Sequence, residues 1–407
     1  MPADGTAREA LKFGPPFEKV DAEAFAAEVD ALHAELKAGL GAADYRHLLK
    51  MVRWTRLSML LGYSVAWIMP NPLSALLIGI GNMGRWANVT HPVMHRGMDK
   101  VPGVPPHYTS KRYAKGWRRF IDWLDWLHPD AWALEHNGLH HFHTGQVEDP
   151  DIVERNAWFI RSKNMPRACK WLFGVALTMS WKFSYYAPNT FFALKQHRLQ
   201  RAASREQQAS GDPVPSMGTV ERWIIPGEKL WLPLNRWAVE YWLRCFLPYP
   251  LFRFGLVPLL FLPLGTSAWA AVLINSVLAE VVANMITFVT IAPNHTGDDL
   301  YRFDTPPRSR AEFYLQQCAA SVNYPSPTVL TDYLQGHLNY QIEHHLWPDL
   351  PLLKYRQAAP RLKEICRRHG VPYIEQNVFR RFAKTWSILM GDSDMLRGGN
   401  PGAARAA

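Results

Sequence analysis

The sequence predicts an all-α membrane protein with four transmembrane helices in two hairpins and a cytosolic helical cap. Charge is the first observation: residues 57–90 contain one charged side chain and residues 246–291 contain two. Turn signals are the second, because proline or glycine interrupts each apolar block near its middle. The third is that all but two of the 45 Lys and Arg residues lie outside these blocks. The two blocks leave three charged regions, one before, one between and one after them. Because Lys and Arg accumulate on the cytosolic side of membrane proteins, all three regions are expected to lie on that side.

Composition narrows the class of protein. The 407 residues are 48% apolar and 20% charged, which excludes disordered, collagen-like and disulfide-scaffold proteins. The four cysteines form no CxxC pair, so neither an iron–sulfur cluster nor a zinc knuckle is expected. A net charge of +10 suits either nucleic acid or anionic lipid headgroups. The sequence has no motif for binding a nucleic-acid groove. The basic run at 111–119 is interleaved with Tyr and Trp, which suits contact with lipid headgroups, so we expect the bilayer as a partner and no nucleic acid.

Residues 1–56 are expected to form a cytosolic N-terminal segment with an amphipathic helix over 21–39. The apolar residues at helical spacing on one face of that helix are Phe25, Val29, Leu32 and Leu36. The helix either packs on the cap or lies on the bilayer. The first twenty residues have no apolar core, so no cleavable signal peptide is expected.

Two hairpins are expected in the apolar blocks. Residues 57–90 are too long for one span and carry Pro70 and Pro72 near the middle, which predicts a helical hairpin with its turn at 69–72. Residues 246–291 predict a second hairpin around a Gly265-Thr266 turn.

The remaining residues are assigned to the cap. Residues 91–245 are expected to carry two histidine clusters, and residues 292–407 a third, followed by a C-terminal tail. Two Trp- and Tyr-rich stretches, 171–186 and 231–242, predict interfacial helices that seat the cap on the membrane. Residues 199–220 read as an exposed polar loop.

Histidine is strongly clustered. Three windows, 91–95, 136–143 and 341–345, hold eight of the sixteen histidines. His91 and His95 are four residues apart and therefore share a helix face, as do His136 and His140. Neighbours such as His140 and His141 point about 100° apart on a helix, so they suit two adjacent ions better than one. The paired His344 and His345 repeat this arrangement, with Gln341 at the leading position.

Such a set of imidazoles predicts a metal centre. Neutral imidazole suits iron, copper or zinc rather than magnesium or calcium. The sequence has no HExxH, so a zinc protease is not indicated. A redox metal beside a lipid phase indicates oxygen chemistry on an apolar substrate, because side chains alone cannot oxidise an unactivated C–H bond.

The three clusters, written HPVMH, HNGLHH and QIEHHLWP, resemble the histidine boxes of the integral-membrane fatty acid desaturase family. Residues 336–351, GHLNYQIEHHLWPDLP, are most similar to its acyl-lipid and front-end branch. The resemblance implies a cytosolic cap that holds a di-iron site, with two iron ions and O2 as cofactors.

The resemblance also implies a set of site residues. The metal ligands it implies are His91, His95, His136, His140, His141, His344 and His345, with His295 after the last span as an eighth. Gln341 and Asn294 are candidates for holding a metal-bound water. No catalytic side chain beyond the metal site is implied. The acidic residues that are candidates for orienting the imidazoles are Asp149, Asp151, Asp298, Asp299 and Glu343.

Three functions are compatible with these observations. The first is desaturation of an acyl chain in a lipid or thioester, and the second is hydroxylation or related oxygenation of an apolar or small amphiphilic substrate on the same scaffold. The third is a metal-binding or transport protein, which the position of the clusters beyond the spans disfavours. No HPGG haem motif occurs, so the electrons are expected from a separate donor: a ferredoxin, a cytochrome b5 or a reductase. The expected location is a bacterial inner membrane, or alternatively the endoplasmic reticulum.

Overall fold

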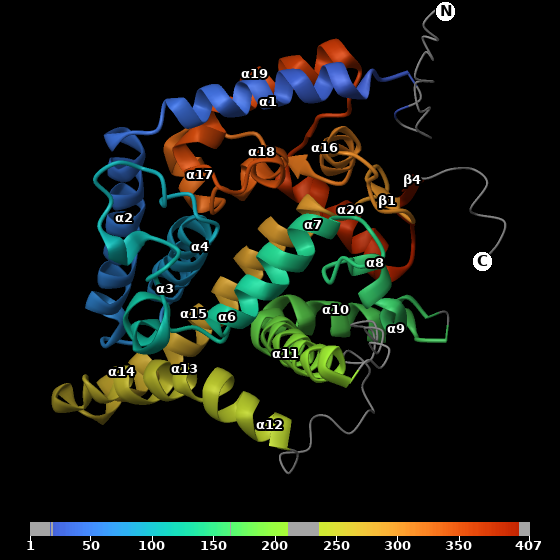
Figure 1. Ribbon diagram of the computed structural model, residues 1–407. Helices are drawn as coiled ribbons and strands as arrows, with labels where there is room; N and C mark the ends of the chain where they lie inside the picture. Colours follow the sequence, from blue (N-terminus) through green and yellow to red (C-terminus); the bar gives the residue numbers. More distant parts are fainter. Residues whose placement is uncertain (1–16, 18, 163, 211–235, 399–407) are drawn as a thin grey trace, which may run out of the picture.

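The computed structural model describes residues 17, 19–162, 164–210 and 236–398 (Figure 1). This part of the chain is mostly helical. Its strands form two short parallel pairs: β1 (Tyr301–Phe303) with β4 (Leu396–Gly398), and β2 (Val322–Asn323) with β3 (Ile374–Glu375). These pairs join segments of the cap that are distant in sequence.

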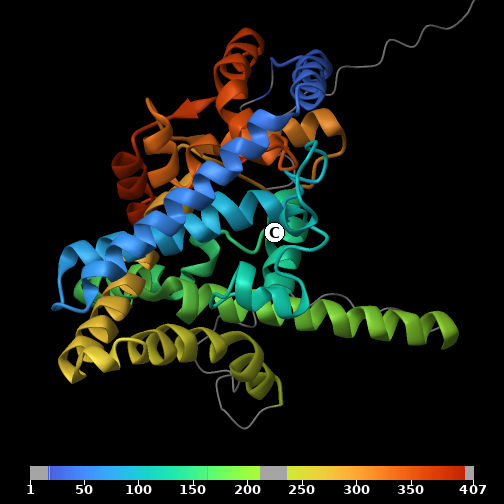
Figure 2. The same cartoon turned by 90° about the vertical axis from the view of Figure 1, so that its left-hand side faces the viewer.

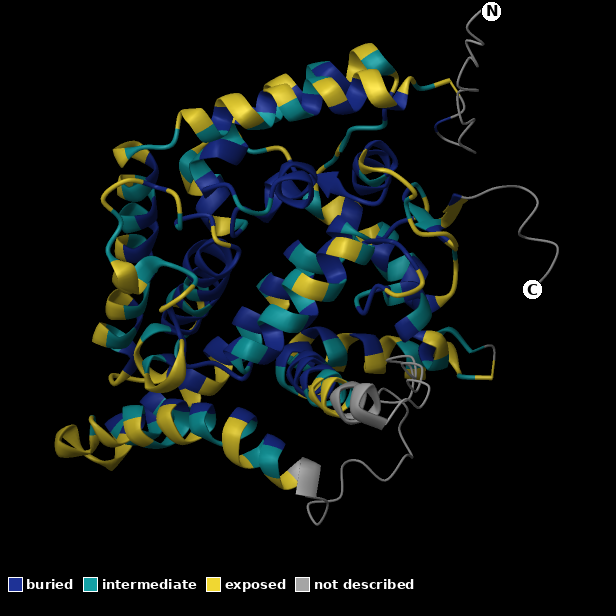
Figure 3. Ribbon diagram, in the orientation of Figure 1, coloured by how far each residue is buried: buried dark blue, intermediate teal, exposed yellow. Residues whose placement is uncertain are grey.

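The N-terminal amphipathic helix packs on the cap. It is α1 (Ala22–Ala38), and it contacts α16 (Arg310–Ala319) and α19 (Leu352–His369). Asp21 caps its first turn by accepting a hydrogen bond from the backbone N–H of Ala24 at 3.0 Å. All four apolar residues named from the sequence are buried, and Figure 3 shows buried and exposed residues alternating along α1. The helix therefore packs on the cap, which is the first of the two placements expected from the sequence.

The first apolar block forms a helical hairpin. Its two helices, α2 (Ala42–Ala66) and α3 (Pro72–Gly84), pack along each other. Asn71 caps α3, because its Oδ1 accepts from the Ser74 N–H at 2.8 Å. α2 begins well before residue 57, so its first turns carry the charged residues of the preceding segment.

Within the described residues, two helices are long and apolar enough to cross a membrane, and together they cover the second apolar block. They span Val239–Leu264 and Thr266–Asn294. Gly265 separates them with a φ of +112°, a conformation that favours glycine. The described residues thus provide two candidate membrane spans, whereas the sequence predicts four.

The first of these candidate spans is irregular because prolines interrupt its hydrogen-bond ladder. Its segments are α12 (Arg236–Tyr241), η8 (Trp242–Phe246), α13 (Pro248–Pro250), η9 (Leu251–Leu256), α14 (Val257–Leu259) and η10 (Leu262–Leu264). The second is α15 (Thr266–Ile291), which continues into η11 (Ala292–Asn294).

α15 connects the hairpins to the cap, and Figure 1 shows it running through the centre of the molecule. Asn275 donates from Nδ2 to the Ala66 carbonyl at 2.8 Å, which ties α15 to the first hairpin. Further along α15, the Glu280 carboxylate accepts hydrogen bonds from Trp126 Nε1 at 2.6 Å and from the Tyr249 hydroxyl at 2.8 Å. Buried polar groups along α15 are therefore paired, as a buried helix requires.

One sequence expectation is wrong in part. Residues 199–210 are not a loop, because α11 (Ala187–Ser210) continues as a helix to Ser210. The segment is rich in Ala, Arg and Gln, which have a high intrinsic preference for the helix. Residues 211–220 lie outside the described residues, as do residues 231–235 of the second aromatic stretch. The first aromatic stretch is helical, in α10 (Arg167–Trp181) and η5 (Lys182–Tyr186).

The remaining elements are mostly short. They are η1 (Arg85–Thr90), α4 (His91–Met94), η2 (Pro106–Tyr108), η3 (Gly116–Arg118), α5 (Arg119–Asp122), α6 (Pro129–Trp132), η4 (Ala133–His140), α7 (His141–His143), α8 (Val153–Asn156), α9 (Trp158–Arg161), α17 (Val329–Leu334), η12 (Leu338–Tyr340), α18 (Gln341–Leu346) and α20 (Val378–Met390).

The contact between α3 and α15 gives a testable prediction. A Cβ at Gly79 would lie 2.8 Å from Val282 Cγ1 and 3.0 Å from the Ala279 carbonyl oxygen, whereas a Cβ at Gly255 would have no atom within 4 Å. We expect Gly79→Ala to lower stability by about 1–3 kcal/mol because the helices must separate. Thermal unfolding in detergent measures this, with Gly255→Ala as the control for helix propensity. Equal melting temperatures for the two variants would contradict the close packing.

Candidate metal centre

Irregular helices carry the first two histidine clusters. His91 begins α4, which continues without a break from α3 through the π-helical segment η1, and His95 caps its C-terminus. His136 and His140 lie on η4, a second π-helical segment, and His141 begins α7. π-Helical turns are rare and occur frequently at functional sites. The third cluster lies on the regular helix α18.

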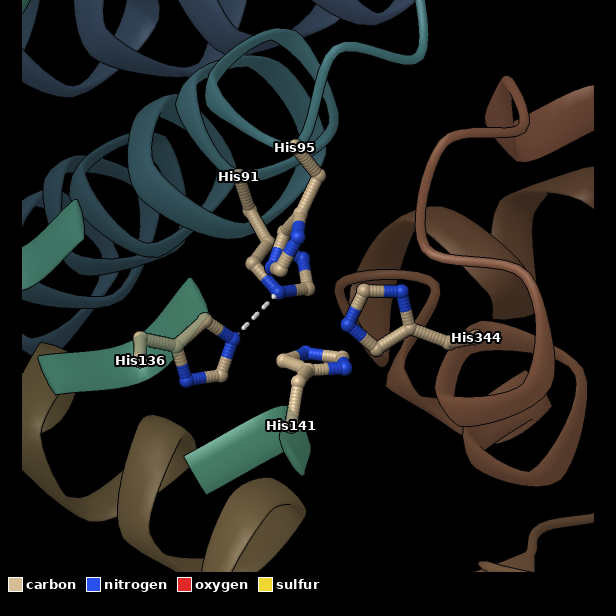
Figure 4. A group of neighbouring side chains, drawn as sticks. All are labelled: His91, His95, His136, His141 and His344. Atoms are coloured by element: carbon tan, nitrogen blue, oxygen red, sulfur yellow. Dashed lines mark hydrogen bonds between the residues drawn. The ribbon is translucent and has the colours of Figure 1, made fainter. Parts of the chain in front are cut away.

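Five histidines form the first group: His91, His95, His136, His141 and His344. One ring nitrogen of each lies within 4.8 Å of the others. Figure 4 shows the five rings converging from different elements on one centre. The Nε2 atoms of His91 and His136 are 3.0 Å apart, close to the separation of two adjacent ligands bound at about 2.0–2.1 Å to one ion.

Three histidines form the second group: His140, His295 and His345, within the same 4.8 Å limit. Two amides adjoin it. Gln341 Nε2 lies 2.9 Å from His295 Nε2, and Asn294 donates from Nδ2 to Gln341 Oε1 at 3.1 Å. The groups are neighbours, because the rings of His141 and His345 stack at a centroid distance of 4.3 Å.

Each pair of adjacent histidines divides between the two groups. His141 and His344 belong to the first group, whereas His140 and His345 belong to the second. This is the division expected from side chains about 100° apart on a helix. The rings of His136 and His140 stack at a centroid distance of 5.3 Å, but the two residues belong to different groups, because His136 is in the first and His140 is in the second.

The donor atoms fit a metal. His95, His141, His344 and His345 each have a buried Nε2 with no hydrogen-bond partner among the described residues. An unpaired buried polar atom is costly, and bound metal would remove that cost. Burial lowers the pKa of both His91 and His295 to about 3, so these imidazoles are neutral and keep a lone pair for a metal at neutral pH.

Outer partners orient several rings through Nδ1. Asp149 accepts from His140 Nδ1 at 2.9 Å, and the Ala320 carbonyl accepts from His295 Nδ1 at 3.0 Å. Burial acts to raise the pKa of Asp149, but the His140 imidazole outweighs it and keeps that pKa low. These contacts leave Nε2 of His140 and His295 directed at the group.

Three more outer partners escaped the sequence analysis. Gln317 Oε1 and Thr144 Oγ1 lie 2.9 and 3.0 Å from His345 Nδ1, and the Tyr355 hydroxyl lies 3.2 Å from His344 Nδ1. Thr144 could be found from the sequence, because it follows His140 by four residues. Its hydroxyl donates to the His140 carbonyl at 2.7 Å. Gln317 and Tyr355 lie on α16 and α19, and no spacing relates them to the clusters.

The acidic residues named from the sequence differ in whether they contact the histidines. Asp149 orients a ring, and Asp151 lies 3.8 Å from His140 Nδ1 and forms a third group with His136 and His140. The others bond elsewhere: Asp298 and Asp299 pair with Lys384, and Glu343 accepts from Asn323 and Tyr373.

Two histidines beside the clusters lie outside both groups. His143 pairs with Gln146 through its Nδ1 at 3.2 Å. His337 lies 2.6 Å from Asn88 Oδ1 through its Nδ1 and packs edge-on against His47. Both therefore have a structural explanation for their positions.

A cavity of about 430 Å³ ends at the histidines. The polar residues at this end are His91, His136, His140, His295, Gln341 and Asp151, and nearly all the rest of the wall is aliphatic or aromatic. The geometry brings all eight histidines named from the sequence to one place, beside an apolar cavity.

Comparison with known proteins identifies the family. The sequence model of the family described as fatty acid desaturase matches residues 66–377. An NADPH-dependent stearoyl-CoA 9-desaturase of Mycobacterium tuberculosis is 29% identical over 126 residues, which cover 30% of this chain and 29% of that protein. Fatty acid desaturase 3 of Bos taurus is 32% identical over 143 residues, which cover 35% and 28%.

A shorter match is 39% identical over 64 residues, 16% of this chain and 15% of an acyl-lipid (8-3)-desaturase of Rebecca salina. The chain therefore matches less than a third of the length of each of these relatives. The family match, by contrast, covers most of the chain and includes all three histidine clusters. The chain belongs to the fatty acid desaturase family.

Proposed function

We propose that the protein is a non-haem di-iron oxidoreductase that uses O2 to desaturate an acyl chain held in a lipid or a thioester. The observation that carries the proposal is the pair of adjacent histidine groups beside an apolar cavity. The names of the relatives, all of them desaturases of fatty acyl chains, support it.

Each histidine group would hold one ion. The ligands would be His91, His95, His136, His141 and His344 on one side, and His140, His295 and His345 on the other. Two bound irons would supply the reduction of O2 and the oxidation of C–H bonds, which no side chain can supply. Gln341 and Asn294, whose amides bond each other beside His295, would hold a water on the second side.

The protein's own contribution is geometry and exclusion of water. The rings are fixed by outer partners such as Asp149 and Gln317, so they cannot turn away from the site. Aromatic walls, including Trp86, Trp132 and Trp181, surround the cavity end and would keep an acyl chain against the histidines. Holding two adjacent carbons near the site is catalysis by positioning.

The proposal includes a membrane topology. The two candidate spans and the first helical hairpin would form a four-helix stem, and the cap would lie on the cytosolic side of a bacterial inner membrane, or of the endoplasmic reticulum. Electrons would come from a separate ferredoxin, cytochrome b5 or reductase. The uneven distribution of basic residues supports the shared cytosolic side.

Metal content tests the ligand set. We expect purified His140→Ala and His344→Ala each to lose iron, because a ligand should matter more than an outer partner, whose loss typically costs about 10–100-fold in metal affinity. Iron per protein, measured by elemental analysis, is the readout. His107→Ala is the matched control, because His107 is exposed and belongs to neither group. Iron content at the parent level in both cluster variants would contradict the assignment.

Lipid mass tests the reaction. We expect membranes that contain the protein, O2 and a reductant system to accumulate acyl lipids two mass units lighter, since desaturation removes two hydrogens. Controls lack O2 or carry His140→Ala. Products sixteen mass units heavier would instead show hydroxylation, because oxygen insertion competes with removal of the second hydrogen.

Cysteine labelling tests the topology. The parent for this test carries Cys169→Ser, because Cys169 is exposed while the other three cysteines are buried. Met69→Cys lies in the first hairpin turn, where Met69 is 60% exposed, and Lys363→Cys lies on α19 of the cap. In sealed spheroplasts we expect an impermeant maleimide to label only Met69→Cys. Labelling of both from outside would refute the shared cytosolic side.

A further inference from the structure

The basic run noted in the sequence lies in a long segment between the first two histidine clusters. This segment, residues 96–122, includes η2, η3 and α5. It packs beside α2, because the rings of Tyr45 and Tyr108 lie 6.3 Å apart. Figure 2 turns the left-hand side of Figure 1 toward the viewer and shows α2 crossing this face. Neither α2 nor residues 96–122 supply a side chain to the histidine groups or the cavity wall, so the proposed reaction leaves the face unexplained.

Positive charge is concentrated on this face. α2 and residues 96–122 together contain eleven Lys and Arg residues but only three acidic residues. These three, Asp44, Asp99 and Asp122, each accept a hydrogen bond from within the protein. Six exposed cations, here called the cationic patch, form no ion pair or side-chain hydrogen bond within the described residues: Arg46, Arg53, Arg56, Lys100, Lys111 and Arg112. A patch of unpaired cations fits a polyanionic partner.

One side of α2 changes from cationic to apolar along its length. Arg46, Arg53, Leu57 and Leu60 are separated by seven, four and three residues, so they lie on the same side of the helix. All four are exposed, Leu57 by 51% and Leu60 by 66%. Exposed leucines that follow exposed arginines are typical of a helix that passes from lipid headgroups into hydrocarbon. The boundary between the two layers therefore lies between Arg53 and Leu57.

The end of the first hairpin holds residues 96–122 at this boundary. Gly84, the last residue of α3, packs against α2, because a Cβ at this position would lie 2.8 Å from Thr55 Oγ1. Arg85 follows and donates from Nη2 to the Ile121 carbonyl at 2.9 Å. Ile121 is therefore fixed close to the point on α2 where arginine gives way to leucine.

Three large apolar side chains are exposed at the same place. Trp117 is 67% exposed, Phe120 57% and Ile121 62%. Arg119, which lies among them in sequence, is buried and donates to the Arg244 carbonyl in the first candidate span. The turn is thus tied to the second hairpin and leaves its apolar side chains outside. Aromatic and aliphatic side chains beside cations are typical of contact with the membrane–water interface.

From these observations we propose that the cationic patch, together with Trp117, Phe120 and Ile121, binds anionic phospholipid headgroups of the cytosolic leaflet. The guanidinium and ammonium groups bind the phosphates, and the three apolar side chains enter the adjoining acyl layer. These lipids are partners rather than substrates, since no residue of the patch lines the cavity. The inference rests on the topology in the proposed function and is independent of the reaction.

An acidic protein would also match the charge of the patch. It would not account for Leu57 and Leu60, which continue the arginine row, or for Trp117 beside them. A bilayer with anionic headgroups accounts for both the cations and the apolar side chains, because it offers phosphate and hydrocarbon next to each other.

Lipid selectivity tests the headgroup class. The full chain is placed in phosphatidylcholine vesicles with spin-labelled phosphatidylglycerol or spin-labelled phosphatidylcholine, and electron paramagnetic resonance gives the fraction of each that the protein holds. We expect the parent to prefer phosphatidylglycerol by about threefold and Lys100→Gln/Lys111→Gln/Arg112→Gln to lose this preference, because cations near the surface attract anionic lipid. The matched control, Lys363→Gln/Arg367→Gln/Arg368→Gln, removes three exposed cations of α19 and should keep it.

Three outcomes would overturn the inference. The first is unchanged selectivity in the patch variant, and the second is equal loss in both triple variants, since charge would then act regardless of position. The third is weaker binding of an acidic electron donor to the patch variant with lipid selectivity unchanged, which would assign the face to a protein. The maleimide test decides the topology separately, so failure here with a cytosolic cap overturns this inference alone.

Depth in the bilayer tests the apolar side chains. In the Cys169→Ser parent, a nitroxide is attached at Phe120→Cys or, as the control in water, at Lys363→Cys. We expect the ratio of collisions with O2 to collisions with a water-soluble nickel complex to be about tenfold higher at Phe120→Cys, because O2 concentrates in the acyl layer that the side chain enters. Equal ratios at the two positions would overturn the insertion.

Discussion

The gathering of eight histidine side chains at one point inside the protein is the constraint on which the rest of the structure depends. Each ring brings two polar nitrogens out of water, and each nitrogen needs a partner. Outer atoms such as Asp149 Oδ1 and Gln317 Oε1 satisfy one side of some rings. The inner nitrogens of His344 and His345 have none among the described residues. These inner nitrogens are therefore available to bind a metal, and the outer partners hold the rings in place around them.

Helix geometry explains how so few elements create two groups. Adjacent histidines diverge on a helix, so His140 and His141 point into different groups, as do His344 and His345. Two short segments can thus serve both groups at once. The π-helical turn at η4 widens the helix between His136 and His140, which lets His136 join the first group while still stacking on its neighbour. Two of the π-helical segments, η1 and η4, therefore lie beside or within the site.

The sequence was informative where the signal is local. Spacing within the clusters indicated seven of the eight histidines, the family resemblance indicated His295, and an apolar face indicated α1. It was uninformative where tertiary contacts decide. Gln317 and Tyr355 reach the site only because α16 and α19 fold over it, and nothing in their neighbourhoods marks them. The polar segment before Ser210 was misjudged because helix propensity, not hydrophobic pattern, keeps it helical.

The two groups are unequal in their number of imidazoles. The first has five imidazoles, whereas the second has three, with Gln341 beside His295. Both groups reach the cavity: His91 and His136 of the first line it, as do His140 and His295 of the second together with Gln341. A catalytic metal site keeps a position for water or substrate, whereas a fully ligated one does not. Under the proposed function, an acyl chain in the cavity would meet both groups, and the group with fewer imidazoles is the one with room for water or substrate.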